Sequence, residues 1–142
     1  MMPSIFTQII NGELPGRFVW KDDEVVAFLT TAPMNPGHTL VVPRQEIDYW
    51  IDMPAALAAQ VMEVAQTVSR AIQQAFDPEK VGLIVAGLEV RHVHLHLVPI
   101  NAISDLNFDR QDKTVTPEIL DKNADSIRSV LRDLGFAAQA TG

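Results

Sequence analysis

Residues 92–98 read HVHLHLV, so a histidine occupies every second position, at His92, His94 and His96. These are three of the four histidines in the chain. Successive side chains of a β-strand point to opposite faces. The pattern therefore predicts a strand over residues 90–98 that carries three imidazoles on one face. The apolar residues between them are expected to face the protein core.

The flanking sequence predicts an α+β domain with a mostly antiparallel sheet. Short apolar runs between turn-forming residues predict further strands. Apolar residues spaced three and four apart predict a long helix, capped by Asp52 and ending near Phe76. Capping residues also predict a short helix after Ser4 and a C-terminal helix after Thr116. The expected strands are residues 18–20, 25–29, 39–42 and 81–85, and the C-terminal helix is expected over about residues 117–134.

Length and composition limit the classes of protein that the chain can represent. Its 142 residues are expected to form a single domain, residues 1–142, with residues 137–142 as a loose tail. The net charge of −7 argues against a DNA- or RNA-binding face. The absence of cysteine excludes disulfides, thiol catalysis and cysteine-bound zinc. With no basic leader and no membrane-spanning run in the sequence, we expect a cytoplasmic protein that has no membrane partner.

Two chemistries fit a row of imidazoles on a strand. Alternate histidines can bind one divalent metal ion, although the first and third lie about 13 Å apart at roughly 3.3 Å per residue. Alternatively, the row surrounds a phosphate, with the middle ring attacking phosphorus and its neighbours donating hydrogen bonds. No acidic residue stands at an obvious spacing for a further metal ligand. We therefore favour the phosphate interpretation, with no metal or other cofactor.

The sequence at this point resembles the histidine triad (HIT) family. Residues 92–98 follow the pattern His-φ-His-φ-His-φ-φ, where φ is apolar, at every position. Residues 36–43, PGHTLVVP, are similar to the family segment Pro-x-His-x-Leu-Val-x-Pro, and residues 4–15 are similar to its N-terminal opening. The resemblance covers about residues 4–99. It implies a five-stranded, mainly antiparallel sheet with helices, and a homodimer formed through the sheet edge and the long helix.

The resemblance also implies an activity, namely hydrolysis or transfer of nucleoside monophosphates from nucleotidyl phosphoramidates or dinucleotide-type substrates. His94 would be the nucleophile and would form a nucleotidyl-histidine intermediate. His96 would contact the phosphate and assist the leaving group. His92 and His38 would orient and polarise the active ring. The alternatives are a non-catalytic nucleotide-binding regulator and a histidine-based metal-binding protein.

A nucleotide site is implied by the same resemblance. Ile5, Phe6, Ile9 and Phe28 match apolar positions that sandwich the base in relatives, although ordinary core packing explains Ile9 and Phe28 nearly as well. Relatives commonly carry an aspartate, which holds the ribose hydroxyls, where this chain has Thr30.

The segment before the triad departs from the family pattern. Residues 86–91, AGLEVR, are shorter than the corresponding loop of many relatives and lack its Gln and its Ser or Thr. Glu89 is therefore either a proton-handling carboxylate or a solvated turn residue, and the sequence favours the turn residue.

Overall fold

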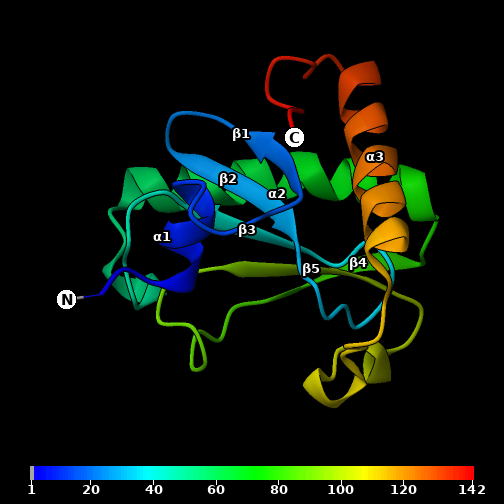
Figure 1. Ribbon diagram of the computed structural model, residues 1–142, viewed down its shortest axis with the longest axis horizontal. Helices are drawn as coiled ribbons and strands as arrows, with labels where there is room; N and C mark the ends of the chain where they lie inside the picture. The colour runs from blue at the N-terminus through cyan, green and yellow to red at the C-terminus, as the bar shows by residue number, and fades with distance from the viewer. Residues whose placement is uncertain (1) are drawn as a thin grey trace.

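The computed structural model, which describes residues 2–142, contains one five-stranded sheet and three α-helices (Figure 1). The strand order is β1-β2-β3-β5-β4, and every neighbouring pair is antiparallel. This arrangement confirms the predicted α+β class. The strands are β1 (Phe18–Lys21), β2 (Val25–Leu29), β3 (Thr39–Pro43), β4 (Lys80–Ile84) and β5 (Leu95–Ile100). The helices are α1 (Ile5–Ile10), α2 (Ala55–Phe76) and α3 (Pro117–Asp133).

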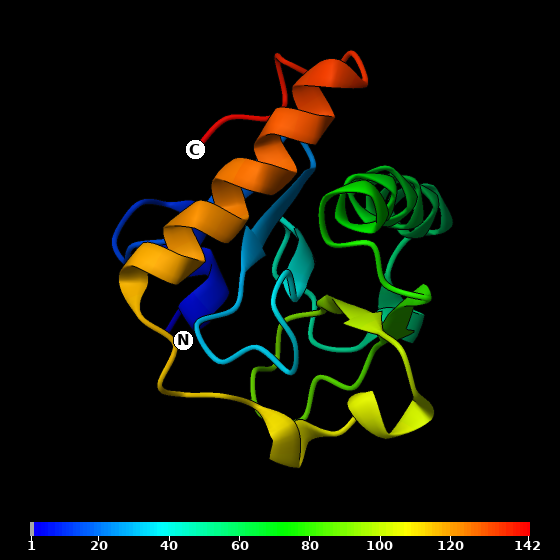
Figure 2. The same cartoon turned by 90° about the vertical axis from the view of Figure 1, so that its right-hand side faces the viewer.

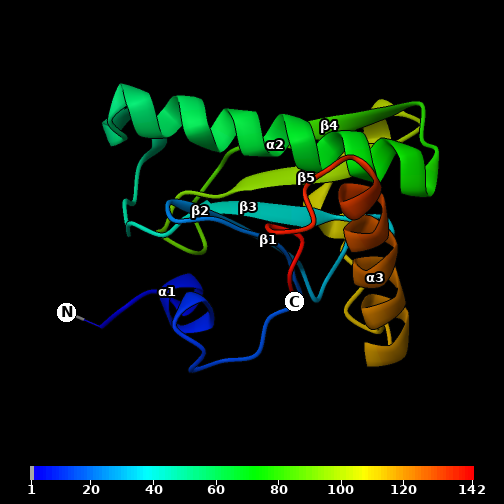
Figure 3. The ribbon, with the colours of Figure 1, turned by 90° about the horizontal axis from the view of Figure 1, so that it is seen from above.

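Helices cover the two faces of the sheet unequally. Figure 3 shows α2 along one side of the strands and the short α1 on the other, and Figure 2 shows α3 crossing beside β1 and β2. The main core lies between the sheet and the two longer helices, and it includes Val41, Leu97 and Ile127. A second, smaller cluster lies under α1 and is built on Phe6, Phe28 and other buried residues. Within residues 2–142, none of the helices is both long enough and apolar enough to cross a membrane.

The long helix begins later than the sequence predicts. Asp52 is not its cap, because Trp50–Asp52 forms a separate 3-10 turn, η1. Met53 is extended, as expected for a residue before proline, since the proline ring disfavours helical backbone there. Pro54 is consequently the N-cap of α2, and the helix starts at Ala55.

The histidine strand is shorter than predicted at its N-terminal end. Residues 90–94 lie outside the sheet, and β5 begins only at Leu95, which pairs with Val41. Pro43, farther along the partner strand, has no N–H to donate, so the ladder cannot continue regularly past it. The amide of Val93 instead donates to the carbonyl of Ile47 at 2.8 Å. The apolar residues between the histidines nevertheless face the main core, as predicted.

The C-terminal segment, predicted to be a loose tail, packs against the domain. Ala140 is fully buried in the main core. The amide of Lys21 donates to the carbonyl of Gln139 at 2.9 Å, and Trp20 lies against Phe136 with ring centroids 5.4 Å apart. Residues 136–140 therefore cover the outer end of β1. The composition of the tail gives no sign of this contact, because the contact depends on where α3 ends.

We expect the glycine that leads into β3 to be intolerant of a side chain. Gly37 has φ +97°, and a Cβ there would lie 2.8 Å from the ring of Phe76 at the end of α2. Gly37→Ala should lower the free energy of unfolding by about 2–4 kcal/mol, from left-handed strain plus overpacking. Chemical denaturation measures this loss. Gly135→Ala is the matched control, because Gly135 has φ +99° but open space around its Cβ position. Equal losses in the two variants would contradict the Phe76 contact.

Candidate active site

The ring of His94 is held by the backbone two residues before it. Its Nδ1 lies 2.7 Å from the carbonyl oxygen of His92. A carbonyl can only accept a hydrogen bond, so Nδ1 carries the proton. In the neutral ring, Nε2 then holds an unshared electron pair. The ring of Phe6 packs edge-on against His94 with centroids 4.8 Å apart, which further limits its orientation.

His96 is oriented through His38. The amide of Met34 donates to His38 Nδ1 at 3.0 Å, so this nitrogen is unprotonated and His38 Nε2 carries the proton. His38 Nε2 lies 2.9 Å from His96 Nδ1 and donates to it. The neutral ring of His96 therefore carries its proton on Nε2. His96 is thus set up as a hydrogen-bond donor, beside a neighbour, His94, set up as an acceptor or nucleophile.

His92 has a different position from the other two triad histidines. Its Nε2 donates to the carbonyl oxygen of Pro43 at 2.8 Å, and its Nδ1 lies 2.7 Å from the hydroxyl of Ser4. Ser4 also caps α1 by accepting the amide of Thr7. Because both ring nitrogens are engaged, the ring of His92 cannot donate to a phosphate as the three-ring hypothesis requires. It joins α1 to the end of β3, and its backbone carbonyl accepts the hydrogen bond from His94 Nδ1.

Burial keeps the four histidines neutral at pH 7. Burial, followed by the neighbouring rings of His96 and His94, lowers the pKa of His38 to about 3. Burial and the neighbouring ring of His94 lower the pKa of His96 to about 4. The pKa values of His92 and His94 are also lowered, chiefly by burial. For His94, the hydrogen bond to the His92 carbonyl and the charge of Glu89 act in the opposite direction. Neutral rings are the state in which the proton assignments above hold.

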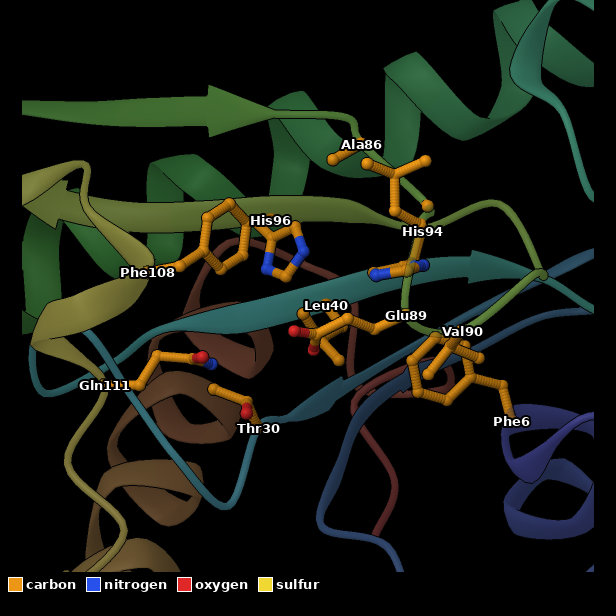
Figure 4. Close-up of a pocket in the computed structure, with 12 residues that line it drawn as sticks. Phe6, Thr30, Leu40, Ala86, Glu89, Val90, His94, His96, Phe108 and Gln111 are labelled. Carbon is orange, nitrogen blue, oxygen red and sulfur yellow. The ribbon is translucent and has the colours of Figure 1, made fainter.

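His94 and His96 form part of the wall of a cavity of about 370 Å³ (Figure 4). Their ring centroids are 4.8 Å apart. The volume suits a small organic ligand. Phe108 lies edge-on to His96, with ring centroids 5.2 Å apart. The remaining lining residues are Phe6, Thr30, Leu40, Ala86, Gly87, Leu88, Glu89, Val90 and Gln111.

The predicted nucleotide-binding residues come together in an adjoining cavity of about 150 Å³. Ile5, Phe6, Ile9, Phe28 and Thr30 all line it. Phe6, Thr30 and Leu40 border both cavities, so these residues lie where the two meet. The hydroxyl oxygen of Thr30 accepts the amide of Ala32 at 3.1 Å, which leaves its proton available to a ligand. The role of these residues in binding a nucleotide stays a prediction.

Two segments without a predicted binding role contribute to the lining, namely residues 86–90 and the connection between β5 and α3. Phe108 and Gln111 lie in the irregular connection between β5 and α3, and Phe108 belongs to the 3-10 turn η3 (Phe108–Arg110). Gln111 is held by donation from its Nε2 to the carbonyl of Ala32 at 3.0 Å. Glu89, interpreted from sequence as a solvated turn residue, is exposed and also borders the cavity. The one sequence signal for these residues was Phe108, an aromatic residue in a polar stretch, and it does not specify where in the fold the side chain lies.

The arrangement of possible ligands does not favour the metal interpretation. Among residues 2–142, no group of three or more histidine, aspartate or glutamate side chains is positioned to hold a metal ion. The ring nitrogens of His38 and His96 that approach each other are joined by a hydrogen bond, and both nitrogens of His92 have protein partners.

Comparisons with known proteins agree with the fold and the histidine pattern. The sequence profile of the HIT domain matches residues 11–102, and the chain belongs to the HIT family. It is 41% identical over 99 residues to an uncharacterized HIT-like protein of Methanocaldococcus jannaschii, covering 67% of this chain and 77% of that protein. The adenylylsulfatase HINT3 of Arabidopsis thaliana is 29% identical over 100 residues, covering 67% of this chain and 51% of that protein. The crystal structure of a Hit-like protein involved in cell-cycle regulation from Bartonella henselae has a TM-score of 0.79 at 28% identity, covering 89% of this chain and 94% of that chain.

The buried histidines should make the protein less stable as the pH falls from 7 to 5. An unfolded histidine has a pKa near 6.5, whereas His38 and His96 have folded values of about 3 and 4. Below pH 6.5 the unfolded chain therefore binds protons that the folded chain does not. Each such histidine lowers the free energy of unfolding by about 1.4 kcal/mol per pH unit. Urea denaturation at several pH values measures the slope.

His38→Asn is the matched variant for this measurement. The Oδ1 of an asparagine can take the place of His38 Nδ1 and accept from the Met34 amide, and the side chain does not titrate. The variant should show a shallower decline in stability between pH 7 and pH 5. Carboxylates contribute little in this interval, because the groups with lowered pKa values have ordinary values of 4.5 or 3.8. An unchanged slope would contradict the neutral buried state of His38.

Proposed function

We propose that the protein is a nucleotide hydrolase or transferase that cleaves the bond between the α-phosphorus of a nucleotide and its leaving group. The observation that carries the proposal is the pairing of His94 with His96. One ring presents an unprotonated Nε2 and its neighbour presents a protonated Nε2, both on the wall of one cavity (Figure 4). A nucleophile beside a hydrogen-bond donor is the arrangement that phosphoryl attack requires.

The first step is attack on phosphorus by the electron pair of His94 Nε2. The phosphorus–nitrogen bond of a phosphoramidate breaks, and the nitrogen takes its bonding pair and a proton from solvent to leave as an amine. The nucleotidyl ring carries a positive charge, because Nδ1 keeps its proton. The carbonyl of His92, 2.7 Å from Nδ1, stabilises that charge. The Nε2–H of His96 donates to a phosphoryl oxygen or to the leaving atom.

Water completes the hydrolysis. Its oxygen bonds to phosphorus, its proton passes to solvent, and the electron pair returns to His94 Nε2. The products are the nucleoside monophosphate and the neutral histidine with which the cycle began. An alcohol or phosphate acceptor in place of water would make the same reaction a transfer. The name of the adenylylsulfatase relative supports chemistry on a nucleotidyl compound.

The base belongs in the cavity of about 150 Å³ in this proposal, and the ribose lies where the two cavities meet. Aromatic and branched side chains, including Phe28 and Ile9, offer the apolar contacts that a base needs. Thr30 stands where the two cavities meet, so its hydroxyl can donate to the ribose. A neutral hydroxyl replaces the aspartate of relatives, and we therefore expect a weaker preference for ribose.

His94→Ala should abolish hydrolysis while changing the affinity for a nucleoside monophosphate by less than about tenfold, because a nucleophile acts mainly in the transition state. Turnover of an adenosine phosphoramidate and calorimetric binding of AMP measure the two quantities. Intact-mass spectrometry of the quenched wild type should show an adduct of one AMP that the variant lacks. Undiminished hydrolysis by the variant would disprove the assignment. AMP binding without turnover by the wild type would favour the non-catalytic alternative.

We also propose that two copies associate through β4 and α2. β4 is an edge strand of the sheet, so its outer backbone groups can pair with a second copy. Apolar side chains are exposed on both elements, at Leu83 on β4 (42% exposed) and Met62 on α2 (46%). Pairing of the two edges would extend the sheet and cover these side chains.

Light scattering of the eluting protein should give twice the chain mass, and Leu83→Arg should shift it to the mass of one chain. A buried arginine at the edge would lose its hydration without a partner. Ile119→Arg is the matched control, because Ile119 is 49% exposed and belongs to α3, which contacts β1 and β2 on the side of the sheet opposite β4. A wild type that elutes as a monomer would contradict the proposal.

A further inference from the structure

Glu89 places a carboxylate at the cavity that contains the two reactive histidines. It lies in the connection between β4 and β5 and borders the same cavity as His94 and His96. Figure 4 shows its side chain among the residues that line the cavity. The charge of Glu89 raises the pKa of His94 against the larger effect of burial.

The charge of this carboxylate is not neutralised by a protein partner. Within residues 2–142, no salt bridge involves Glu89, and the nearby Arg91 is directed to Asp48 at 3.9 Å. The lining includes neither lysine nor arginine among the described residues. With both histidines neutral at pH 7, the cavity wall has one full charge, and that charge is negative.

The position of Glu89 assigns it to the leaving group. The base occupies the apolar cavity beyond Phe6, Thr30 and Leu40 in the proposed function. Glu89 borders only the other cavity, together with the rest of residues 86–90. A group bonded to the α-phosphorus on the side away from the nucleoside therefore passes close to this carboxylate.

We propose that Glu89 determines specificity for the leaving group, favouring amines that carry a second positive charge and disfavouring polyphosphates. This inference rests on the proposed function. A carboxylate attracts an alkylammonium group and accepts its hydrogen bonds. The same carboxylate repels the additional phosphates of a dinucleoside polyphosphate, and no lysine or arginine of the described lining offsets that repulsion. The preferred substrates are then nucleotidyl phosphoramidates of diamines, in which the second amine stays protonated.

The expected discrimination is measurable. A pair of unit charges about 6 Å apart, at an effective dielectric constant between those of protein and water, interacts strongly enough to change kcat/KM by about 10- to 100-fold. Screening by salt reduces the effect at this partly open site. The preference should therefore decrease as ionic strength rises.

The experiment compares three substrates with a common adenylyl group. The first is AMP joined by a phosphorus–nitrogen bond to 1,4-diaminobutane, and the second is AMP joined in the same way to pentylamine, which has a similar length but no second charge. The third is diadenosine tetraphosphate. The wild type should have a kcat/KM for the diamine compound at least about tenfold above that for the pentylamine compound, and higher still above that for the tetraphosphate.

Glu89→Gln removes the charge and keeps the size of the side chain. The ratio of the diamine to the pentylamine kcat/KM should decrease toward one, and the relative rate on the tetraphosphate should rise. Glu79→Gln is the control, because it changes the net charge equally from an exposed turn beside β4 and should preserve the wild-type ratios. Ratios that Glu89→Gln leaves unchanged would overturn the inference. Hydrolysis of none of the three substrates by the wild type, with no adduct on His94, would instead contradict the proposed function.

Discussion

The site depends on the hydrogen bond between His94 Nδ1 and the carbonyl of His92, which are 2.7 Å apart. One peptide group of the same chain fixes which nitrogen of the ring carries the proton, and therefore which nitrogen is free to react. The carbonyl of His92 is available for this contact because residue 92 precedes β5 and lies outside the sheet. A carbonyl engaged in the ladder would be directed toward the partner strand. The irregular segment before β5 is thus what allows the backbone to orient its own side chain.

The other histidines fix further proton positions around the site and join it to α1 and β3. The Met34 amide donates to His38 Nδ1, so His38 carries its proton on Nε2 and donates it to His96 Nδ1. The backbone N–H of Met34 therefore determines that His96 carries its proton on Nε2. His92 ties the capping residue of α1 to β3, and α1 in turn brings Phe6 against His94. These contacts require neutral rings, and burial keeps the rings neutral because it disfavours the charged form. Because the rings are buried, their hydrogen bonds also hold α1 and β3 to the segment that contains the histidines.

The surroundings of the two reactive rings differ in kind on the two sides of the cavity. Towards α1, the wall is aromatic and aliphatic and leads to the cavity that we assign to the base. Towards residues 86–90, it contains Glu89. The Bartonella henselae protein shares the fold, as the TM-score of 0.79 indicates. In the proposed function, the shared fold supplies the histidines that react at phosphorus, and the segments around the sheet select the group attached to it.

The sequence by itself determined the antiparallel sheet, the two longer helices and the alternation that directs Leu95 and Leu97 to the core, because these follow from local periodicity and from a motif within a few residues. It also indicated that the histidines belong together. Only the tertiary structure decided that His38 acts on His96, that the ring of His92 is engaged by Ser4 and Pro43, and that Glu89, Phe108 and Gln111 reach the cavity. Those contacts join segments far apart in the chain, and no local spacing specifies them. The early end of the ladder at β5 has the same origin, since it depends on a proline in the neighbouring strand and not on the histidine sequence.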